Sequence, residues 1–203
     1  MREAPRADSK TSDAIRILAI GGSTRPESSS EVALRMAADG ARRDGAEVTI
    51  ISGRTLLFPI YDTETTERDP RAQVLVDAVR AADGLIIVSP GYHGGISGLV
   101  KNALDYVEDL AGDPRPYLDG MAVGCIAVAH GWQATVSTLQ QLRQVVHALR
   151  GWPTPLGGAV NSSQVRLAAA GEDDPAVEQL RAVGAQVVEF ARMRQAFQGT
   201  LDP

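Results

Sequence analysis

Short apolar segments alternate along this chain with longer segments in which apolar residues recur every three or four positions. Four of the short segments are continuously apolar, which is typical of strands covered on both faces, as in a parallel sheet. A fifth short segment is weaker. The expected strands are residues 15–20, 48–51, 84–89, 121–128 and 156–160.

The segments between these strands have the spacing of amphipathic helices. An alanine-rich helix is expected over residues 30–43, where its small residues suit close packing on a sheet, and another over residues 134–150. The last helix is expected to start at Asp173-Asp174-Pro175, where acidic residues precede an early proline. Five strand–helix units predict a doubly wound α/β fold, with five parallel strands and helices on both faces.

The organisation of the chain is simple. Residues 15–197 are expected to form a single domain, preceded by a polar tail, residues 1–14, that we expect to be disordered. That tail has no apolar centre, so it does not resemble a secretory signal. The longest apolar run, residues 121–129, is far shorter than the roughly 20 residues of a membrane helix. We therefore expect a cytoplasmic protein.

The amino-acid composition excludes several kinds of functional site. Apolar residues make up 44% of the 203 residues but aromatic residues only 4%, so the core must consist mainly of alanine, valine, leucine and isoleucine. The single cysteine, Cys125, excludes a disulfide framework and an iron–sulfur cluster, and we expect it to be inert core. The three histidines are not at metal-ligand spacing, so no metal is expected. A net charge of −5 argues against nucleic-acid binding.

The segment after the first strand combines a glycine pair, several hydroxyls and a helix start. Gly21 and Gly22 precede a serine-rich stretch that contains Arg25. Backbone N–H groups at a helix N-terminus favour an anion, and Arg25 adds a charge-assisted hydrogen bond. Neither a Walker A loop nor a G-x-G-x-x-G fingerprint is present. This loop alone allows two interpretations: a phosphate-binding site, or a polar loop in which serines 28–30 only cap the helix.

A glycine-rich segment, residues 89–98, follows the third strand. Its glycines permit tight turns, so a planar ligand can lie against main-chain N–H groups, with Tyr92 and His93 beside it. The alternative is a turn that ends with Ser97 as the N-cap of the next helix. That interpretation accounts for the end of the segment but not for residues 90–94. In a sheet ordered 2-1-3-4-5, strands one and three flank the switch point where ligands bind. The two loops together therefore suit flavin mononucleotide (FMN).

Both loops carry a resemblance to a known family. Residues 22–30, GSTRPESSS, resemble the G-S-x-R-x-x-S-x-N loop of the NADPH-dependent FMN reductases. Residues 90–105, PGYHGGISGLVKNALD, resemble the longer and more specific P-x-Y-[NH]-x-x-x-x-G-x-L-K-N-A-x-D segment of that family. The resemblance implies a flavodoxin-like fold, bound FMN, oxidation of NADPH, and a homodimer or homotetramer with the flavin near a subunit interface.

The resemblance also implies which residues bind the cofactor. The residues expected to hold the FMN phosphate are Ser23, Arg25, Ser28 and Ser30. Those expected to line the isoalloxazine ring are Pro90, Gly91, Tyr92, His93, Gly94 and Ile96, followed after the fourth strand by His130, Gly131 and Trp132. Four of these depart from the family pattern: Ser30 replaces an asparagine, Gly91 a frequent glutamate, and His130 and Trp132 stand where small residues are common.

The implied reaction transfers hydride from NADPH to flavin N5 and then to an acceptor such as free flavin, a quinone, an azo compound or a metal oxyanion. The cofactor carries this chemistry, so no catalytic side chain is expected. A flavin-dependent monooxygenase is one expected partner. The alternative is a flavodoxin-like electron carrier that does not oxidise NAD(P)H, although the T-x-T-G-x-T loop of flavodoxins is absent. A flavin-free relative with a blocked pocket is a third interpretation.

Overall fold

The computed structural model describes residues 14–200, so the predicted disordered tail lies outside the described residues except for Ala14. Its helices and strands, in chain order, are β1 (Arg16–Gly21), α1 (Ser29–Arg43), β2 (Glu47–Ser52), η1 (Gly53–Leu56), α2 (Pro70–Ala81), β3 (Gly84–Tyr92), β4 (Gly95–Ile96), α3 (Gly98–Asp105), η2 (Tyr106–Leu110), β5 (Ala122–Ala129), α4 (Trp132–Ala148), β6 (Trp152–Pro153), β7 (Gly158–Asn161), η3 (Leu167–Ala169) and α5 (Pro175–Gly199).

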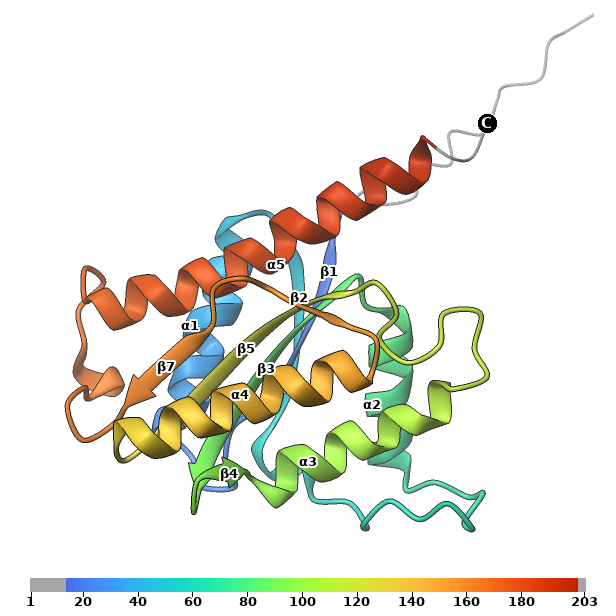
Figure 1. Ribbon diagram of the computed structural model, residues 1–203, viewed down its shortest axis with the longest axis horizontal. Coiled ribbons are helices and arrows are strands. Elements are labelled where there is room, and N and C mark those ends of the chain that lie inside the picture. Colours follow the sequence, from blue (N-terminus) through green and yellow to red (C-terminus); the bar gives the residue numbers. More distant parts are fainter. Residues whose placement is uncertain (1–13, 201–203) are drawn as a thin grey trace, which may run out of the picture.

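A parallel sheet runs through the centre of the molecule, with strands in the order β2-β1-β3-β5-β6 and with β7 also paired to β5. Helices α1 and α5 cover one face, and α2, α3 and α4 cover the other (Figure 1). This arrangement confirms the predicted doubly wound α/β class and places β1 beside β3. The four apolar segments are strands as predicted, and β1, β3 and β5 are buried between two helical layers, whereas β2 lies at the edge of the sheet and none of its residues is fully buried.

The predicted fifth strand, residues 156–160, is wrong in its details. Two short strands, β6 and β7, pair with different ends of β5 in its place. Pro153 is the second residue of β6, and Pro155 lies between β6 and β7. Proline has no N–H to donate to a neighbouring strand. The edge of the sheet is therefore interrupted, and with the short β4 the sheet has seven strands instead of five.

A hairpin replaces the loop that we predicted after the third strand. Strand β3 continues to Tyr92, and β4 returns antiparallel to it, with Gly91 opposite Ile96. The two turn residues, His93 and Gly94, have φ values of 53° and 82°. Two successive positive φ values are typical of a type I′ turn, whose twist matches that of paired strands.

Helix α4 begins two residues before the predicted start. It buries Leu142 and Val146, as the apolar spacing predicts, and also Thr135 and Thr138, whereas Leu139 and Leu149 are half-buried against the same core. The Thr135 hydroxyl donates to the carbonyl of Gly131 (2.8 Å), so this side chain is buried with a hydrogen-bond partner. The small threonines let this end of α4 lie close to the sheet.

Helices α1 and α5 pack with their backbones in contact. An ideal Cβ on Gly184 of α5 would stand 1.9 Å from the carbonyl oxygen of Ala37, and one on Gly40 of α1 would stand 2.1 Å from that of Arg181. Neither position has space for a side chain. The small residues of α1 thus serve its packing against α5 as well as against the sheet.

Aromatic residues of the segment between β2 and α2 form a structural cluster. Phe58 and Tyr61 pack edge-on against Tyr106, with ring centroids 4.9 and 5.1 Å apart. Arg68 lies over the Tyr61 ring and pairs with Asp109 at 2.7 Å. Burial, and next the hydrogen bond to Asp109, raise the pKa of Tyr61. These contacts fix the segment against η2.

The expectation that Cys125 is inert core is confirmed. Cys125 is buried within β5, and burial raises the pKa of its thiol to about 12, so the thiol is inert at neutral pH. His147 lies exposed on α4. Within residues 14–200, no helix has the length and apolar character needed to cross a membrane.

Candidate functional site

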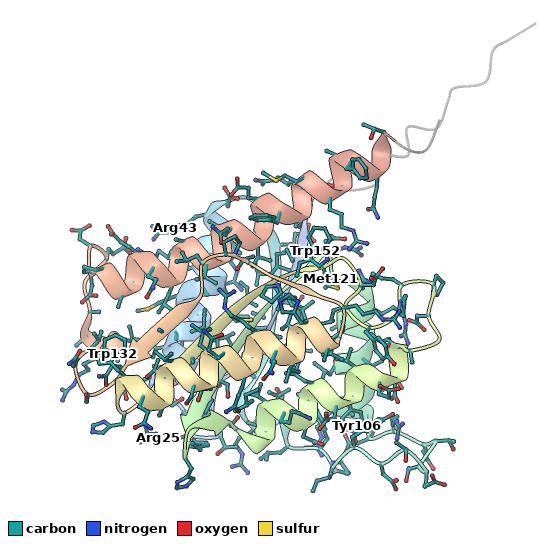
Figure 2. All side chains as sticks on the ribbon, in the orientation of Figure 1. Arg25, Arg43, Tyr106, Met121, Trp132 and Trp152 are labelled. Atoms are coloured by element: carbon teal, nitrogen blue, oxygen red, sulfur yellow. The ribbon has the colours of Figure 1, made fainter. Side chains whose placement is uncertain are left out.

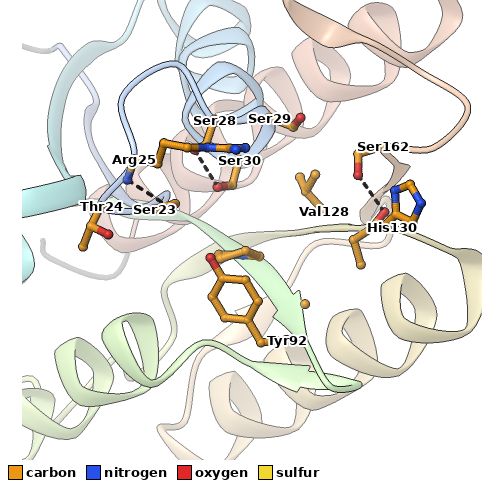
Figure 3. Close-up of a pocket in the computed structure, with 13 residues that line it drawn as sticks. Ser23, Thr24, Arg25, Ser28, Ser29, Ser30, Tyr92, Val128, His130 and Ser162 are labelled. Carbon is orange, nitrogen blue, oxygen red and sulfur yellow. Dashed lines mark hydrogen bonds between the residues drawn. The ribbon is translucent and has the colours of Figure 1, made fainter.

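A cleft of about 490 Å³ opens at the carboxyl ends of β1, β3 and β5 (Figure 3). This is the switch-point edge at which doubly wound sheets bind ligands. Three segments line it: the β1–α1 loop, the end of β3, and the end of β5 with the residue after β7. The lining residues are Ser23, Thr24, Arg25, Ser28, Ser29, Ser30, Pro90, Gly91, Tyr92, Val128, Ala129, His130 and Ser162.

The β1–α1 loop supplies hydroxyls and one guanidinium. Ser28 is the N-cap of α1, and its hydroxyl accepts from the backbone N–H of Glu31 at 3.3 Å. The hydroxyls of Ser28 and Ser30 are 3.2 Å apart, and the Ser23 hydroxyl accepts from the backbone N–H of Arg25 at 3.3 Å. Ser28 therefore caps the helix and lines the cleft, so the two interpretations of this loop are compatible.

The electrostatics of this wall favour an anion. The N-terminus of α1 carries the equivalent of roughly half a positive charge. Arg25 is exposed at the same edge, and among the described residues it is the only lysine or arginine in the lining. A phosphate is the kind of group that hydroxyls, a guanidinium and a helix N-terminus bind together.

The second wall is the backbone of Pro90 and Gly91. An ideal Cβ on Gly91 would lie 2.7 Å from Thr138 Oγ1 and 2.9 Å from the Cβ of Ala129. Because Thr138 of α4 and Ala129 of β5 fill this direction, a larger side chain in place of Gly91 could not be accommodated without moving them. Beside them, Tyr92 is 56% exposed at the mouth of the cleft. The wall is thus flat main chain with one aromatic ring at its edge.

The third wall includes a residue that the sequence analysis missed. Ser162 follows β7, and both its backbone N–H and its hydroxyl donate to the carbonyl of Ala129, at 2.9 and 3.2 Å. This contact brings the residue after β7 beside His130, as Figure 3 shows. The sequence signal was the run Asn161-Ser162-Ser163 at the end of the weakest predicted strand.

Eight of the predicted site residues lie together in the cleft. They are Ser23, Arg25, Ser28, Ser30, Pro90, Gly91, Tyr92 and His130. The other five, His93, Gly94, Ile96, Gly131 and Trp132, are not among the lining residues.

The hairpin explains three of these five positions, because it bends toward α4. The carbonyl of Gly94 accepts hydrogen bonds from the Ser137 hydroxyl (2.9 Å) and Gln141 Nε2 (3.0 Å), and the N–H of Ile96 donates to Gln141 Oε1 (3.3 Å). His93 is exposed in the turn between them. The hairpin is therefore held by α4 and presents only its first residues to the cleft.

The remaining two positions mark the start of α4. Gly131 is the N-cap of this helix and has φ 134°, and Trp132 is its first residue. Trp132 is half exposed at the end of the helix (Figure 2). No group of three or more histidine, cysteine, aspartate or glutamate residues that could hold a metal ion occurs within the described part of the chain.

Comparison with known sequences gives one family. The sequence model described as NADPH-dependent FMN reductase matches residues 15–165. The chain is 29% identical over 117 residues to an NADPH azoreductase of Bacillus sp. (strain OY1-2), covering 57% of this chain and 62% of that protein. It is 29% identical over 139 residues to an NAD(P)H-dependent FMN reductase of Pseudomonas aeruginosa, covering 66% and 71%. The chain thus spans less than two thirds of the Bacillus relative.

Comparison with solved structures addresses the fold. A flavoenzyme NAD(P)H:(acceptor) oxidoreductase of Paracoccus denitrificans superposes with a TM-score of 0.71 at 14% identity, covering 89% of this chain and 98% of that one. A flavodoxin from the domain Archaea superposes with a TM-score of 0.60 at 11% identity, covering 88% and 99%. At such identities the superpositions show the fold alone, and they confirm that it is flavodoxin-like.

Proposed function

This chain belongs to the NADPH-dependent FMN reductase family, and from that membership we propose that it is an enzyme that oxidises NADPH with FMN as its cofactor and reduces a small-molecule acceptor. One observation carries the proposal. The hydroxyls of Ser23, Ser28 and Ser30 and the guanidinium of Arg25 gather at the N-terminus of α1, beside a flat main-chain wall at Gly91. The hydroxyls and the guanidinium suit a phosphate, and the main-chain wall suits a planar ring, so the residues present fit FMN.

The proposed roles of the chain are binding and orientation. The β1–α1 loop would hold the phosphate through its hydroxyls and Arg25, and the backbone at Pro90 and Gly91 would support the ring. Tyr92 and His130 would border the ring at the mouth of the cleft. FMN, when bound, supplies hydride transfer, so we assign no catalytic side chain.

The predicted FMN contacts that do not line the cleft stay predictions. They are His93, Gly94, Ile96, Gly131 and Trp132.

For the electron acceptor we propose a chemical class and no single compound. Relatives of this chain carry the names NADPH azoreductase and quinone reductase, and azo compounds and quinones are flat, conjugated and reducible in two-electron steps. We propose such a molecule, or free flavin, as the acceptor.

The purified protein is expected to be yellow, or to become so when FMN is added, and NADPH is expected to bleach it within seconds under anaerobic conditions. Absorbance near 450 nm measures this, with NADH as a parallel reductant and FMN without protein as the control. A colourless protein that takes up no FMN would contradict the proposal. Flavin that binds but is reduced only by a protein redox partner would favour the electron-carrier alternative.

Some expectations from the sequence remain proposals. We propose that residues 15–197 form a single domain, which is supported by the joining of all the strands from β1 to β7 in one sheet. A cytoplasmic location and a flavin-dependent monooxygenase partner stay predictions, to be checked by cell fractionation and by co-purification. We also propose that the chain forms a homo-oligomer.

An exposed apolar groove supports the homo-oligomer. Trp152 of β6 and Met193 and Phe197 of α5 are 67%, 54% and 64% exposed, and they line a groove of about 710 Å³. The groove lies at the amino end of β5, opposite the cleft (Figure 2). The end of α5 projects beyond the sheet (Figure 1), so the projecting turns of one copy can fill the groove of a second about a two-fold axis.

Phe197→Asp is expected to convert the oligomer to a smaller species, because a charge would then have to be buried in the groove. Sedimentation velocity measures this. Val74→Asp is the matched control, since Val74 is 61% exposed on α2, on the other face of the sheet. An unchanged sedimentation coefficient for Phe197→Asp, or a monomeric wild type, would contradict this interface.

A further inference from the structure

Glu31 is a buried carboxylate behind the phosphate loop that the proposed function does not use. It is the third residue of α1 and is only 9% exposed. Its Oε2 accepts from the Ser52 hydroxyl at 3.1 Å, whereas its Oε1 has no hydrogen-bond partner among the described residues. No salt bridge joins it to an arginine or lysine within residues 14–200. A buried charge with so little compensation calls for a functional explanation.

Helix capping does not provide that explanation. A glutamate at this position often accepts from the backbone N–H of the N-cap residue and so forms a capping box. Here the N–H of Ser28, the N-cap residue, donates to the carbonyl of Arg25 instead, at 3.4 Å. The Glu31 carboxylate is turned toward the β1 and β2 ends. There an ideal Cβ on Gly22, at φ 80°, would be 1.9 Å from Oε1.

The carboxylate lies on the far side of the same loop that lines the cleft. Ser23 and Thr24 line both the cleft and a smaller pocket that contains Glu31, Arg35 and Arg54. Of the charged residues around that pocket, Arg35 is paired with Glu27 at 2.8 Å, and Arg54 is exposed to solvent. Among the described residues, neither arginine forms a salt bridge with Glu31.

We propose that Glu31 sets the affinity for FMN by opposing its phosphate, so that the phosphate contributes less to binding than the donor set alone would give. The helix N-terminus offers roughly half a positive charge, and the carboxylate at its third residue offsets part of it. Arg25 then provides the remaining positive charge at the phosphate site. The inference rests on the proposed function, because it concerns the FMN phosphate.

Glu31→Gln tests the proposal, because glutamine removes the charge but keeps an oxygen that can accept from Ser52. The flavin-free protein is titrated with FMN and, separately, with riboflavin, which lacks the phosphate, and quenching of flavin fluorescence gives the two dissociation constants. We expect roughly tenfold tighter FMN binding, with riboflavin binding changed less than twofold. Stopped-flow displacement should show slower release of FMN. Glu189→Gln, an exposed residue of α5 beside Asp44, controls for net charge.

The outcomes separate the alternatives. Unchanged or weaker FMN binding would overturn the proposal, and so would an equal change for both flavins, which indicates a purely structural role. If Glu31→Gln does not fold, Glu31→Ala is subject to the same comparison of the two flavins. Absence of FMN and riboflavin binding in the wild type would instead contradict the proposed function.

Discussion

Replacing Arg25 with alanine is expected to weaken FMN binding by about 10- to 100-fold, the usual loss for one hydrogen bond to a charged group. Arg25 is the only lysine or arginine among the described residues that line the cleft, so no other guanidinium or ammonium group there can replace it. Riboflavin binding should stay the same, because riboflavin has no phosphate. Isothermal titration of both flavins measures the effect.

Arg54→Ala is the matched control for Arg25→Ala. Arg54 is also an exposed arginine near the carboxyl ends of the strands, but it lines the smaller pocket behind the loop. Its loss should change FMN affinity less than threefold. An Arg25→Ala protein with full FMN affinity would show that the phosphate lies elsewhere. If the KM for NADPH rises while FMN affinity is unchanged, Arg25 binds the 2′-phosphate of NADPH instead of the FMN phosphate.

Gly184→Ala is expected to destabilise the protein by about 3 kcal/mol, although alanine is the better helix former by about 1 kcal/mol. The added Cβ would stand 1.9 Å from the carbonyl oxygen of Ala37, and a backbone atom cannot move away as a flexible side chain can. Helices α1 and α5 would have to separate along their contact. Thermal unfolding should show a midpoint roughly 6–12 °C lower.

Gly112→Ala is the corresponding control, because nothing lies within 4 Å of an ideal Cβ at Gly112. Its melting temperature should remain within about 2 °C of the wild type. A Gly184→Ala protein as stable as the wild type would show that the two helices can separate without loss. Both variants should keep wild-type FMN affinity, since neither glycine lines the cleft.

The regular part of the fold could be predicted because its signals are local. Four strands are continuous apolar runs, and the helix caps at Ser97 and Asp174 are visible in the sequence and present in the structure. The hairpin after β3 and the division of the edge strand were missed, because β4 and β6 have two residues each and are too short to show periodicity. The buried threonines of α4 were missed for a different reason. Thr138 is buried against the backbone of Gly91, and Thr135 faces the carbonyl groups of Gly131 and Val160, contacts that only the tertiary structure shows.

The functional site also has a part that the sequence predicts and a part that only the fold assembles. The phosphate loop is contiguous in sequence, so its four predicted residues fall together in the cleft. Ser162 comes from a segment more than thirty residues beyond its neighbour Ala129, and only the pairing of β7 with β5 brings the two together. Phe58 and Tyr61 follow β2 in the sequence, but they pack on Tyr106 and do not line the cleft. A position after a strand end therefore does not by itself predict that an aromatic residue lines the cleft.

The divided edge strand also affects how the protein behaves at high concentration. A long regular edge presents a row of free N–H and C=O groups to which another chain can add a strand. On the β6–β7 side, prolines and the break between the two strands shorten that row. On the β2 side, six consecutive residues form a regular edge. Misassembly into extended sheets should therefore start from β2, and a proline or lysine introduced there would reduce aggregation without touching the cleft.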